Sequence, residues 1–88
     1  MNDQNNHYTP RINLVQDYIT HHLKEEIKLE ILAGVAGFSP FHFHRIFKDM
    51  VGETVNNFII RQKLERALSL MKHRHRLTLT EIAIDSGF

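Results

Sequence analysis

The sequence predicts an all-α fold, and three kinds of observation support it. Apolar residues recur three or four positions apart through most of the 88-residue chain, which is the spacing of one helix face. Ser39-Pro40 places a capping side chain before a proline, and proline is best tolerated in the first turn of a helix. Gly52 then follows an apolar segment, as glycine often follows the last residue of a helix. We therefore expect helices joined by short turns.

The composition is that of one small globular unit. Of the 88 residues, 42% are hydrophobic and 24% are charged, which is too apolar for a disordered chain and too polar for a membrane protein. No run of about 18 apolar residues is present, and residues 1–7 are polar, so neither a membrane span nor a secretory signal is expected. The chain has no cysteine, which excludes a disulfide framework and a thiolate zinc site. We expect a cytoplasmic protein.

The first helix is expected to begin after Thr9 and to end near His22. Thr9 has the character of an N-cap and Pro10 would occupy the first helical position, so residues 1–10 are predicted to be an N-terminal tail. Four apolar residues at helical spacing should face the core, namely Ile12, Val15, Ile19 and Leu23.

Two short helices follow a polar link. The first is broken at Gly37, and the second begins at Ser39-Pro40. Ala33 is small enough for the helices to cross closely, and Gly37 can adopt backbone conformations that other residues resist. Two helices around such a turn form the helix-turn-helix plan, so residues 11–53 are predicted to be one helix-turn-helix subdomain. The apolar positions of the first short helix are Leu29, Leu32, Ala33 and Ala36.

A long fourth helix should link this subdomain to the rest of the chain. Thr54 provides an N-cap and the helix should continue to Met71 or Lys72, so residues 54–72 are predicted to be a linker helix. One of its faces should pack on the first subdomain and another on the second. The first face comprises Val55, Phe58 and Ile59, and the second comprises Leu64, Ala67, Leu68 and Met71.

The chain contains an internal repeat. The segments LEILAGVAGF at 29–38 and LTEIAIDSGF at 79–88 align, with matching leucine, alanine, glycine and phenylalanine positions. Thr78 and Glu81 have the spacing of a capping box at the start of the second copy. In the first copy a helix follows the Gly-Phe turn, whereas the second copy stops at the turn. Residues 73–88 are therefore predicted to be an incomplete second helix-turn-helix subdomain, and the chain is expected to be truncated within it.

The helix expected at about residues 40–51 has two opposed faces when successive residues are placed about 100° apart. The apolar face should join the core and comprises Phe43, Ile46, Phe47 and Met50. The opposite face carries side chains of another kind, namely Phe41, His44, Arg45 and Lys48.

Each side chain of this opposite face suits a contact with DNA. Arg45 can form two hydrogen bonds with guanine, His44 can donate or accept one at a base edge, and Lys48 can reach a phosphate. Phe41 suits a thymine methyl group or sugar, and the alternative is that it folds back on the rim of the domain. His42 flanks the face, where it suits either the DNA backbone or packing near the turn.

Basic residues are concentrated late in the chain. Residues 1–30 carry three basic and five acidic side chains, whereas residues 61–76 carry six basic side chains against Glu65 alone. Such a segment could contact nucleic-acid phosphates, or it could form a solvated helix face. The six basic residues are Arg61, Lys63, Arg66, Lys72, Arg74 and Arg76.

The run LEILAGVAGFSPFHFHRIFKDMVGETVNNFIIRQKLERALSLM, with the I-A-x-x-x-G-F echo at 82–88, resembles the DNA-binding region of the AraC/XylS family. The resemblance covers about residues 11–88. It implies a bacterial transcription regulator in which two helix-turn-helix subdomains, bridged by the long helix, place recognition helices in successive major grooves of double-stranded DNA. It also implies RNA polymerase as a partner of the intact protein.

Roles for individual side chains follow from the resemblance and from the basic segment. Base contacts fall on the helix at about 40–51, and contacts to the DNA backbone fall on that helix and on the start of the basic segment. The expected base-contacting residues are Phe41, His44 and Arg45, and the expected backbone-contacting residues are His42, Lys48 and Arg61.

Other functions have less support from the residues. The histidine pairs within 21–22, 42–44 and 73–75 lack the i, i+4 spacing of helical zinc sites, so no metal site is expected. No nucleophile and base stand at a recognisable spacing, so neither an enzyme nor a cofactor is expected. The alternative function is a helical protein-interaction module without DNA binding of its own. In addition, the exposed apolar face of the linker helix could form a homodimer.

Overall fold

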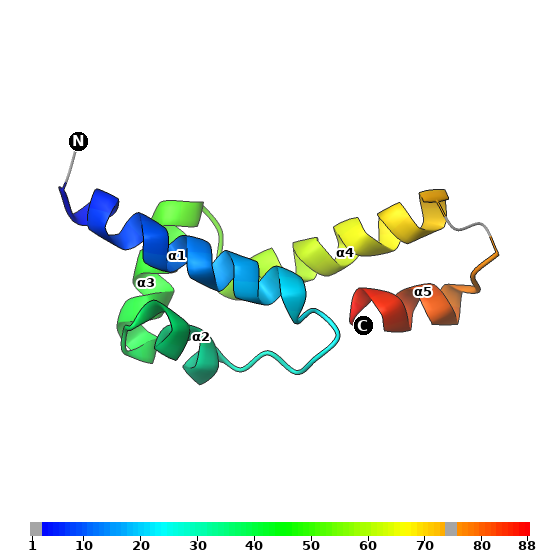
Figure 1. Cartoon of the computed structure of the whole chain (residues 1–88), viewed down its shortest axis with the longest axis horizontal. Helices are drawn as coiled ribbons and strands as arrows, with labels where there is room; N and C mark the ends of the chain where they lie inside the picture. Colours follow the sequence, from blue (N-terminus) through cyan, green and yellow to red (C-terminus); the bar gives the residue numbers. More distant parts are fainter. Residues whose placement is uncertain (1–2, 74–75) are drawn as a thin grey trace.

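The computed structural model describes residues 3–73 and 76–88. Over these ranges the chain is helical without strands, which confirms the predicted all-α fold class (Figure 1). No helix in the described ranges is long and apolar enough to cross a bilayer. Arg74 of the basic segment and His75 of the third histidine pair lie outside the described residues. The helices are α1 (Asp3–His21), α2 (Leu29–Ala36), α3 (Pro40–Val51), α4 (Val55–His73) and α5 (Leu79–Ser86).

α1 begins at Asp3 and not after the cap predicted at Thr9, so much of the expected N-terminal tail is helical. Pro10 lies inside the helix, where it removes a backbone donor and normally destabilises the interior. A tertiary contact offsets this cost, because the Tyr8 ring packs edge-on against Phe38 with the ring centroids 5.1 Å apart. The local cap signal was wrong here, because packing against the turn after α2 supports a longer helix.

The turn between α2 and α3 has the predicted geometry. Gly37 adopts the left-handed conformation, with φ at 76°. The N–H of Phe38 donates to the Ala33 carbonyl at 2.9 Å, which satisfies a carbonyl at the end of α2. Ser39 then caps α3, and its Oγ accepts a hydrogen bond from the N–H of His42 at 3.3 Å. The helix-turn-helix plan is therefore present.

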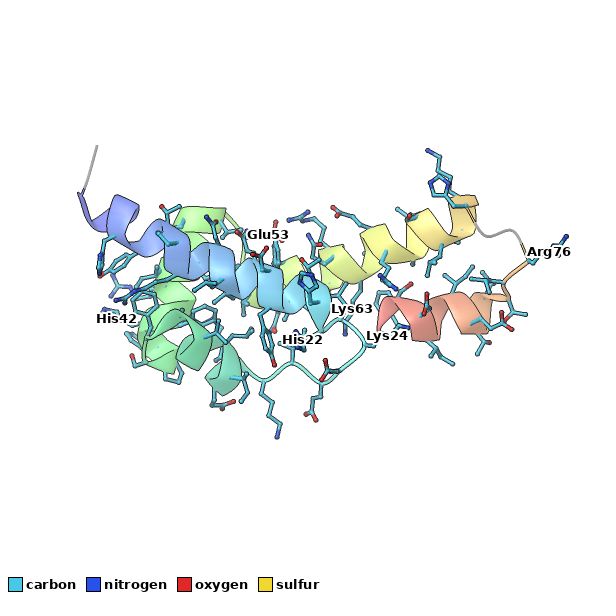
Figure 2. All side chains as sticks on the ribbon, in the orientation of Figure 1. His22, Lys24, His42, Glu53, Lys63 and Arg76 are labelled. Atoms are coloured by element: carbon cyan, nitrogen blue, oxygen red, sulfur yellow. The ribbon has the colours of Figure 1, made fainter. Side chains whose placement is uncertain are left out.

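α4 occupies the residues for which a long helix was predicted. The Oγ1 of Thr54 accepts a hydrogen bond from the N–H of Asn57 at 3.2 Å, and the helix ends at His73, just past the predicted end. Its first turns join the core, while its later turns lie alongside α5 (Figure 1). Figure 2 shows Lys63, in the middle of α4, close to the C-terminal end of α5. This arrangement makes the molecule elongated, with principal extents of 49 × 26 × 16 Å.

α5 has the same length as α2 and repeats the geometry of its C-terminal end. Thr78 and Glu81 form the predicted capping box, in which the Thr78 Oγ1 accepts from the Glu81 N–H at 3.1 Å. At the other end Gly87 has φ at 97°, and the N–H of Phe88 donates to the Ala83 carbonyl at 2.9 Å. The end of α2 has the same hydrogen bond between equivalent residues, so the internal repeat in the sequence is also a repeat of backbone structure.

α5 covers a different side of α4 from the one predicted. Of the four residues expected to face it, only Ala67 is half-buried. Leu70, which was not among the four, is also half-buried. Leu64, Leu68 and Met71 remain about half exposed or more. A single short helix covers one side of α4, which leaves these three residues as an apolar strip on its surface.

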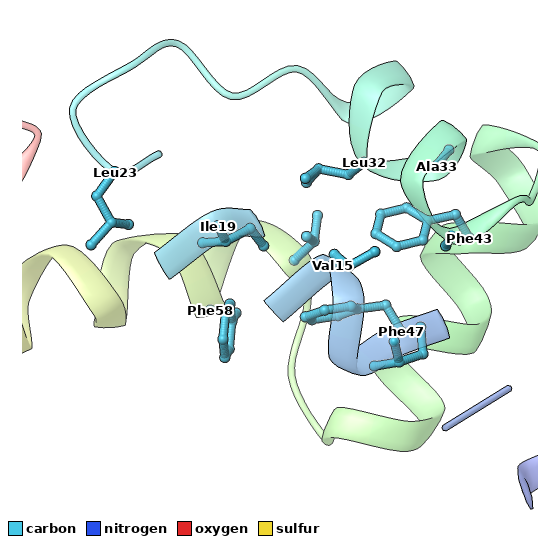
Figure 3. Packing of buried hydrophobic residues seen from close by; sticks show 11 residues of the cluster. Val15, Ile19, Leu23, Leu32, Ala33, Phe43, Phe47 and Phe58 are labelled. Atoms are coloured by element: carbon cyan, nitrogen blue, oxygen red, sulfur yellow. The ribbon is translucent and has the colours of Figure 1, made fainter. Parts of the chain in front are cut away.

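The core lies between α1, α2, α3 and the first turns of α4 (Figure 3). Phe43 and Phe47 of α3 are fully buried, with ring centroids 5.7 Å apart. Phe47 also meets Phe58 of α4 edge-on at 5.6 Å, which ties the linker helix to the first subdomain. The buried cluster contains most of the predicted core positions and comprises Ile12, Val15, Ile19, Leu23, Leu32, Ala33, Ala36, Phe43, Phe47, Val55 and Phe58.

Candidate nucleic-acid interface

α3 separates a buried apolar face from an exposed polar one, as its periodicity predicted. The rings of Phe43 and Phe47 point into the core (Figure 3), whereas Phe41 is 75% exposed. His42, at the start of the helix, lies at the surface (Figure 2). Phe41, His44, Arg45 and Lys48 together form the exposed face of α3.

The start of α3 is fixed from two sides. Ser39 caps its first turn, and Pro40 stands at the position where a proline suits a helix. From the other side, α1 holds the preceding turn through Tyr8 and Arg11. The Arg11 guanidinium lies 5.1 Å from the centroid of the Phe38 ring, and Tyr8 packs on the edge of the same ring. The helix that carries the exposed face is therefore anchored by its cap, its turn and its core face.

Tyr8 and Arg11 were not among the predicted site residues. A signal for Tyr8 exists in the sequence, because Tyr8 stands one helical turn before Ile12 and continues the same apolar spacing. The cap-like Thr9-Pro10 pair hides this signal. Nothing comparable in the sequence identifies Arg11, because its partner Phe38 lies in the turn between α2 and α3, far from Arg11 along the chain.

The cations on the exposed face of α3 have no partner within the described ranges 3–73 and 76–88. No carboxylate or carbonyl there pairs with the side chain of Arg45 or Lys48. Asp49, the acidic residue of α3, forms no ion pair with either of them. A guanidinium and an ammonium without internal carboxylates are available for an external anion.

Arg61 is in a different situation, although it was predicted to share the role of Lys48. Its Nε donates to the two carboxylate oxygens of Glu53 at 3.1 and 3.3 Å, and its Nη1 donates to Glu65 at 2.8 Å. The hydrogen bond to Glu65, with a further contribution from Glu53, raises the pKa of the Arg61 guanidinium. The guanidinium also lies 5.4 Å from the Phe58 ring centroid. A phosphate contact by Arg61 would therefore compete with two carboxylates.

The described part of the basic segment is divided between internal contacts and solvent. The Nε of Arg66 donates to the Asp85 carbonyl at 2.6 Å, and the Nζ of Lys63 lies 5.8 Å from the Phe88 ring centroid. The remaining described cations, Lys72 and Arg76, are exposed. Only part of the basic segment is thus available to an external partner.

The histidines do not assemble a metal site in the part of the chain that the structure describes. No group of three potential ligand side chains gathers there. The Nδ1 of His21 lies 2.7 Å from the Asp17 carbonyl, and the Nδ1 of His22 lies 2.6 Å from the Tyr18 carbonyl. Each of these rings is thus engaged by a backbone carbonyl of α1.

A family profile described as a helix-turn-helix domain matches residues 32–88, which is more than half of the chain. The chain is also 37% identical over 81 residues to the XylDLEGF operon transcriptional activator of Pseudomonas putida. The chain belongs to the AraC/XylS family. It is a DNA-binding domain of a family of transcription regulators and not of a family of enzymes.

Further relatives of this AraC/XylS-type domain are also regulators. It is 36% identical over 72 residues to an uncharacterized HTH-type transcriptional regulator, YbfP, of Bacillus subtilis, a match that covers 81% of the chain and 24% of the relative. It is 31% identical over 64 residues to the probable transcription factor PqrA of Proteus vulgaris, covering 73% of the chain and 52% of the relative. The match to the Pseudomonas activator covers 90% of the chain and 25% of that protein. The chain therefore spans about a quarter of the length of two of these relatives and about half of the third.

Proposed function

We propose that this AraC/XylS-type domain binds double-stranded DNA with a sequence preference, with α3 in the major groove, and so controls transcription. The observation that carries the proposal is the exposed face of α3, whose cations have no internal partner in the described ranges. These side chains project from a helix anchored in the core by Phe43 and Phe47. The major groove, about 12 Å wide, admits one such helix. This role places the protein in the cytoplasm, where bacterial DNA lies.

Three side chains of the exposed face are proposed to contact bases. Arg45 can donate two hydrogen bonds to O6 and N7 of guanine, which is the commonest specific arginine contact. His44 shares the face and can donate or accept at a base edge. Phe41 is 75% exposed, so packing its ring against a thymine methyl group would remove apolar surface from water.

Three further side chains are proposed to contact the DNA backbone. Lys48 is unpaired within the described ranges and extends from the same face of α3. His42 is exposed in the first turn of α3, beside the helix N-terminus. Arg61 is expected to contribute least, because its guanidinium would have to exchange Glu53 or Glu65 for a phosphate.

Selection of bound sequences from a random DNA pool, followed by fluorescence anisotropy over a series of salt concentrations, tests this proposal. We expect the pool to converge on one motif, and the affinity for that motif to fall steeply as salt rises, because phosphate contacts release counterions. Equal affinity for selected and random DNA would contradict base readout. A chain that binds no DNA at low salt would instead favour the helical protein-interaction module.

Two protein partners belong to the same proposal. RNA polymerase is the partner implied by a role in transcription for the intact regulator. A second copy of this chain is proposed to cover the apolar strip of Leu64, Leu68 and Met71, which α5 leaves exposed. A two-fold contact between the strips of two chains would bury both with the same set of residues.

A further inference from the structure

The carboxylate of Asp85, in the last turn of α5, joins three elements of the fold. Its Oδ1 lies 2.5 Å from the Nζ of Lys24, in the segment that follows α1. Its Oδ2 lies 3.6 Å from the Nη2 of Arg66, in α4. One carboxylate thus connects the first subdomain, the linker helix and the start of the second subdomain.

Two contacts that involve the backbone lie beside these ion pairs. Arg66 also donates from its Nε to the Asp85 carbonyl at 2.6 Å, so it holds both the side chain and the main chain of that residue. Gly87 packs so closely on the Leu23 carbonyl that a Cβ at this position would overlap it. Figure 2 shows Lys24 and Lys63 near this end of α5, and Figure 1 shows the segment after α1 reaching toward it.

Apolar packing alone fixes α5 weakly. Its buried residues are Ile82 and Ser86, so only one large apolar side chain of this helix is removed from water. A single exposed ion pair also stabilises a protein little. Here, however, two cations form ion pairs with one carboxylate, and one of them, Arg66, also donates a hydrogen bond to the backbone. A network of this kind restricts orientation more than an isolated pair does.

We propose that Asp85 is a positioning residue that fixes α5, and with it the second helix-turn-helix unit, against the first subdomain through Lys24 and Arg66. The absence of a side chain at Gly87 allows the contact, because it lets the turn after α5 meet the Leu23 carbonyl. The consequence for DNA rests on the proposed function. Two units held at a fixed angle can read two half-sites only at one spacing, as in other paired helix-turn-helix readers.

Distance measurements by double electron–electron resonance test the proposal on the chain without DNA. The chain has no native cysteine, so Glu30→Cys on α2 and Thr80→Cys on α5, both at exposed positions, place one spin label on each side of the contact. We expect a narrow distance distribution in the parent. Asp85→Asn should broaden it and lengthen the mean distance, and Asp85→Glu, which keeps the charge, should largely restore it.

Two further variants separate this contact from general effects of charge and strain. Lys24→Glu should broaden the distribution as Asp85→Asn does, whereas Lys28→Glu, the same charge change on an exposed residue of the same segment, should leave it unchanged. Gly87→Ala should shift the distance, because its Cβ meets the Leu23 carbonyl. Gly52→Ala, at a similar φ with no atom within 4 Å of the added Cβ, should lower stability with a smaller shift.

The result that overturns the proposal is an unchanged distribution in both Asp85→Asn and Lys24→Glu. Broadening accompanied by loss of helical far-ultraviolet circular dichroism, and not reversed in Asp85→Glu, would also overturn it, because α5 would then be melting and not turning on α4. The distance distribution and the circular dichroism are both measured on the chain without DNA. A failure of the proposed DNA binding would therefore not change either result.

Discussion

At the scale of single residues, the exposed face of α3 carries two cations of different chemistry. Arg45 presents a planar fork of donors, whereas Lys48 presents a compact charge on a flexible stem. Both are exposed, and neither has an internal partner in the described ranges. Replacing either one therefore breaks no internal ion pair, so the effects on DNA binding can be compared directly.

Arg45→Ala is expected to weaken binding to the selected DNA by about 1–3 kcal/mol and to relax the preference at one base pair. The physical reason is the loss of two directed hydrogen bonds to one base. Binding to random DNA should change much less. Anisotropy titrations with both DNAs measure the difference, and equal losses on the two would remove Arg45 from the base-contacting residues.

Lys48→Ala is expected to weaken binding to all sequences similarly and to flatten the salt dependence of the affinity, by about one released counterion. Arg61→Ala should have a smaller effect on both quantities, because Glu53 and Glu65 already occupy its guanidinium. Lys28→Ala, which removes an exposed lysine outside the proposed interface, is the matched control and should change neither quantity. A salt slope that Lys48→Ala leaves unchanged would argue against its phosphate contact.

At the scale of elements, the helix boundaries show what local sequence determines. The caps predicted at Ser39, Thr54 and Thr78 are all present, because a cap acts within one helical turn. The cap predicted at Thr9 is not used, because Tyr8 gains a contact with a residue of another element. Local rules contain no information about that contact.

In the candidate site too, some features follow from local sequence and others only from the fold. The exposure of Phe41 beside a buried Phe43 follows from helical periodicity, so the two faces of α3 could be predicted. The pairing of Arg61 with Glu65 is also local, since the two stand four residues apart on one helix. The contact between Lys24 and Asp85 could not be predicted, because the fold alone brings those segments together.

Ser39→Ala is expected to lower the free energy of unfolding by about 0.5–2 kcal/mol, because the N–H of His42 loses its side-chain acceptor. Urea unfolding followed by circular dichroism measures this change. Ser69→Ala, an exposed position inside α4, is the matched control and should be neutral or slightly stabilising, since alanine is the better helix former. Equal stabilities of the two variants would show that the cap contributes nothing.

At the scale of the whole molecule, the two halves differ in how well their apolar surface is covered. The first subdomain has a closed core, whereas α5 leaves the apolar strip of α4 in solvent. Exposed patches of this kind commonly mark interaction sites. The large apolar residues exposed on α4, on α5 and after it include Leu64, Leu68, Met71, Leu79, Ile84 and Phe88.

A concentration-dependent dimer is expected in sedimentation equilibrium, because burying each large apolar side chain contributes on the order of 1.5–3 kcal/mol. Leu68→Glu should shift the equilibrium toward monomer. Leu14→Glu makes the same change at an exposed leucine of α1 and is the matched control. A clean monomer at high concentration, with Leu68→Glu altering neither mass nor solubility, would show that the strip does not drive association.

The two copies of the Gly-Phe turn share one hydrogen-bonding pattern but not one environment. The N–H groups of Phe38 and Phe88 each donate to an alanine carbonyl at 2.9 Å. Phe38 lies beneath Tyr8 and Arg11, whereas Phe88 is 57% exposed. In deuterated water the Phe88 amide should therefore exchange through fraying at the end of α5, and the Phe38 amide only when the first subdomain opens. Equal protection of the two amides would mean that α1 adds nothing to the turn. The expected order would give the same turn two different opening rates, with the slower one in the turn that precedes α3.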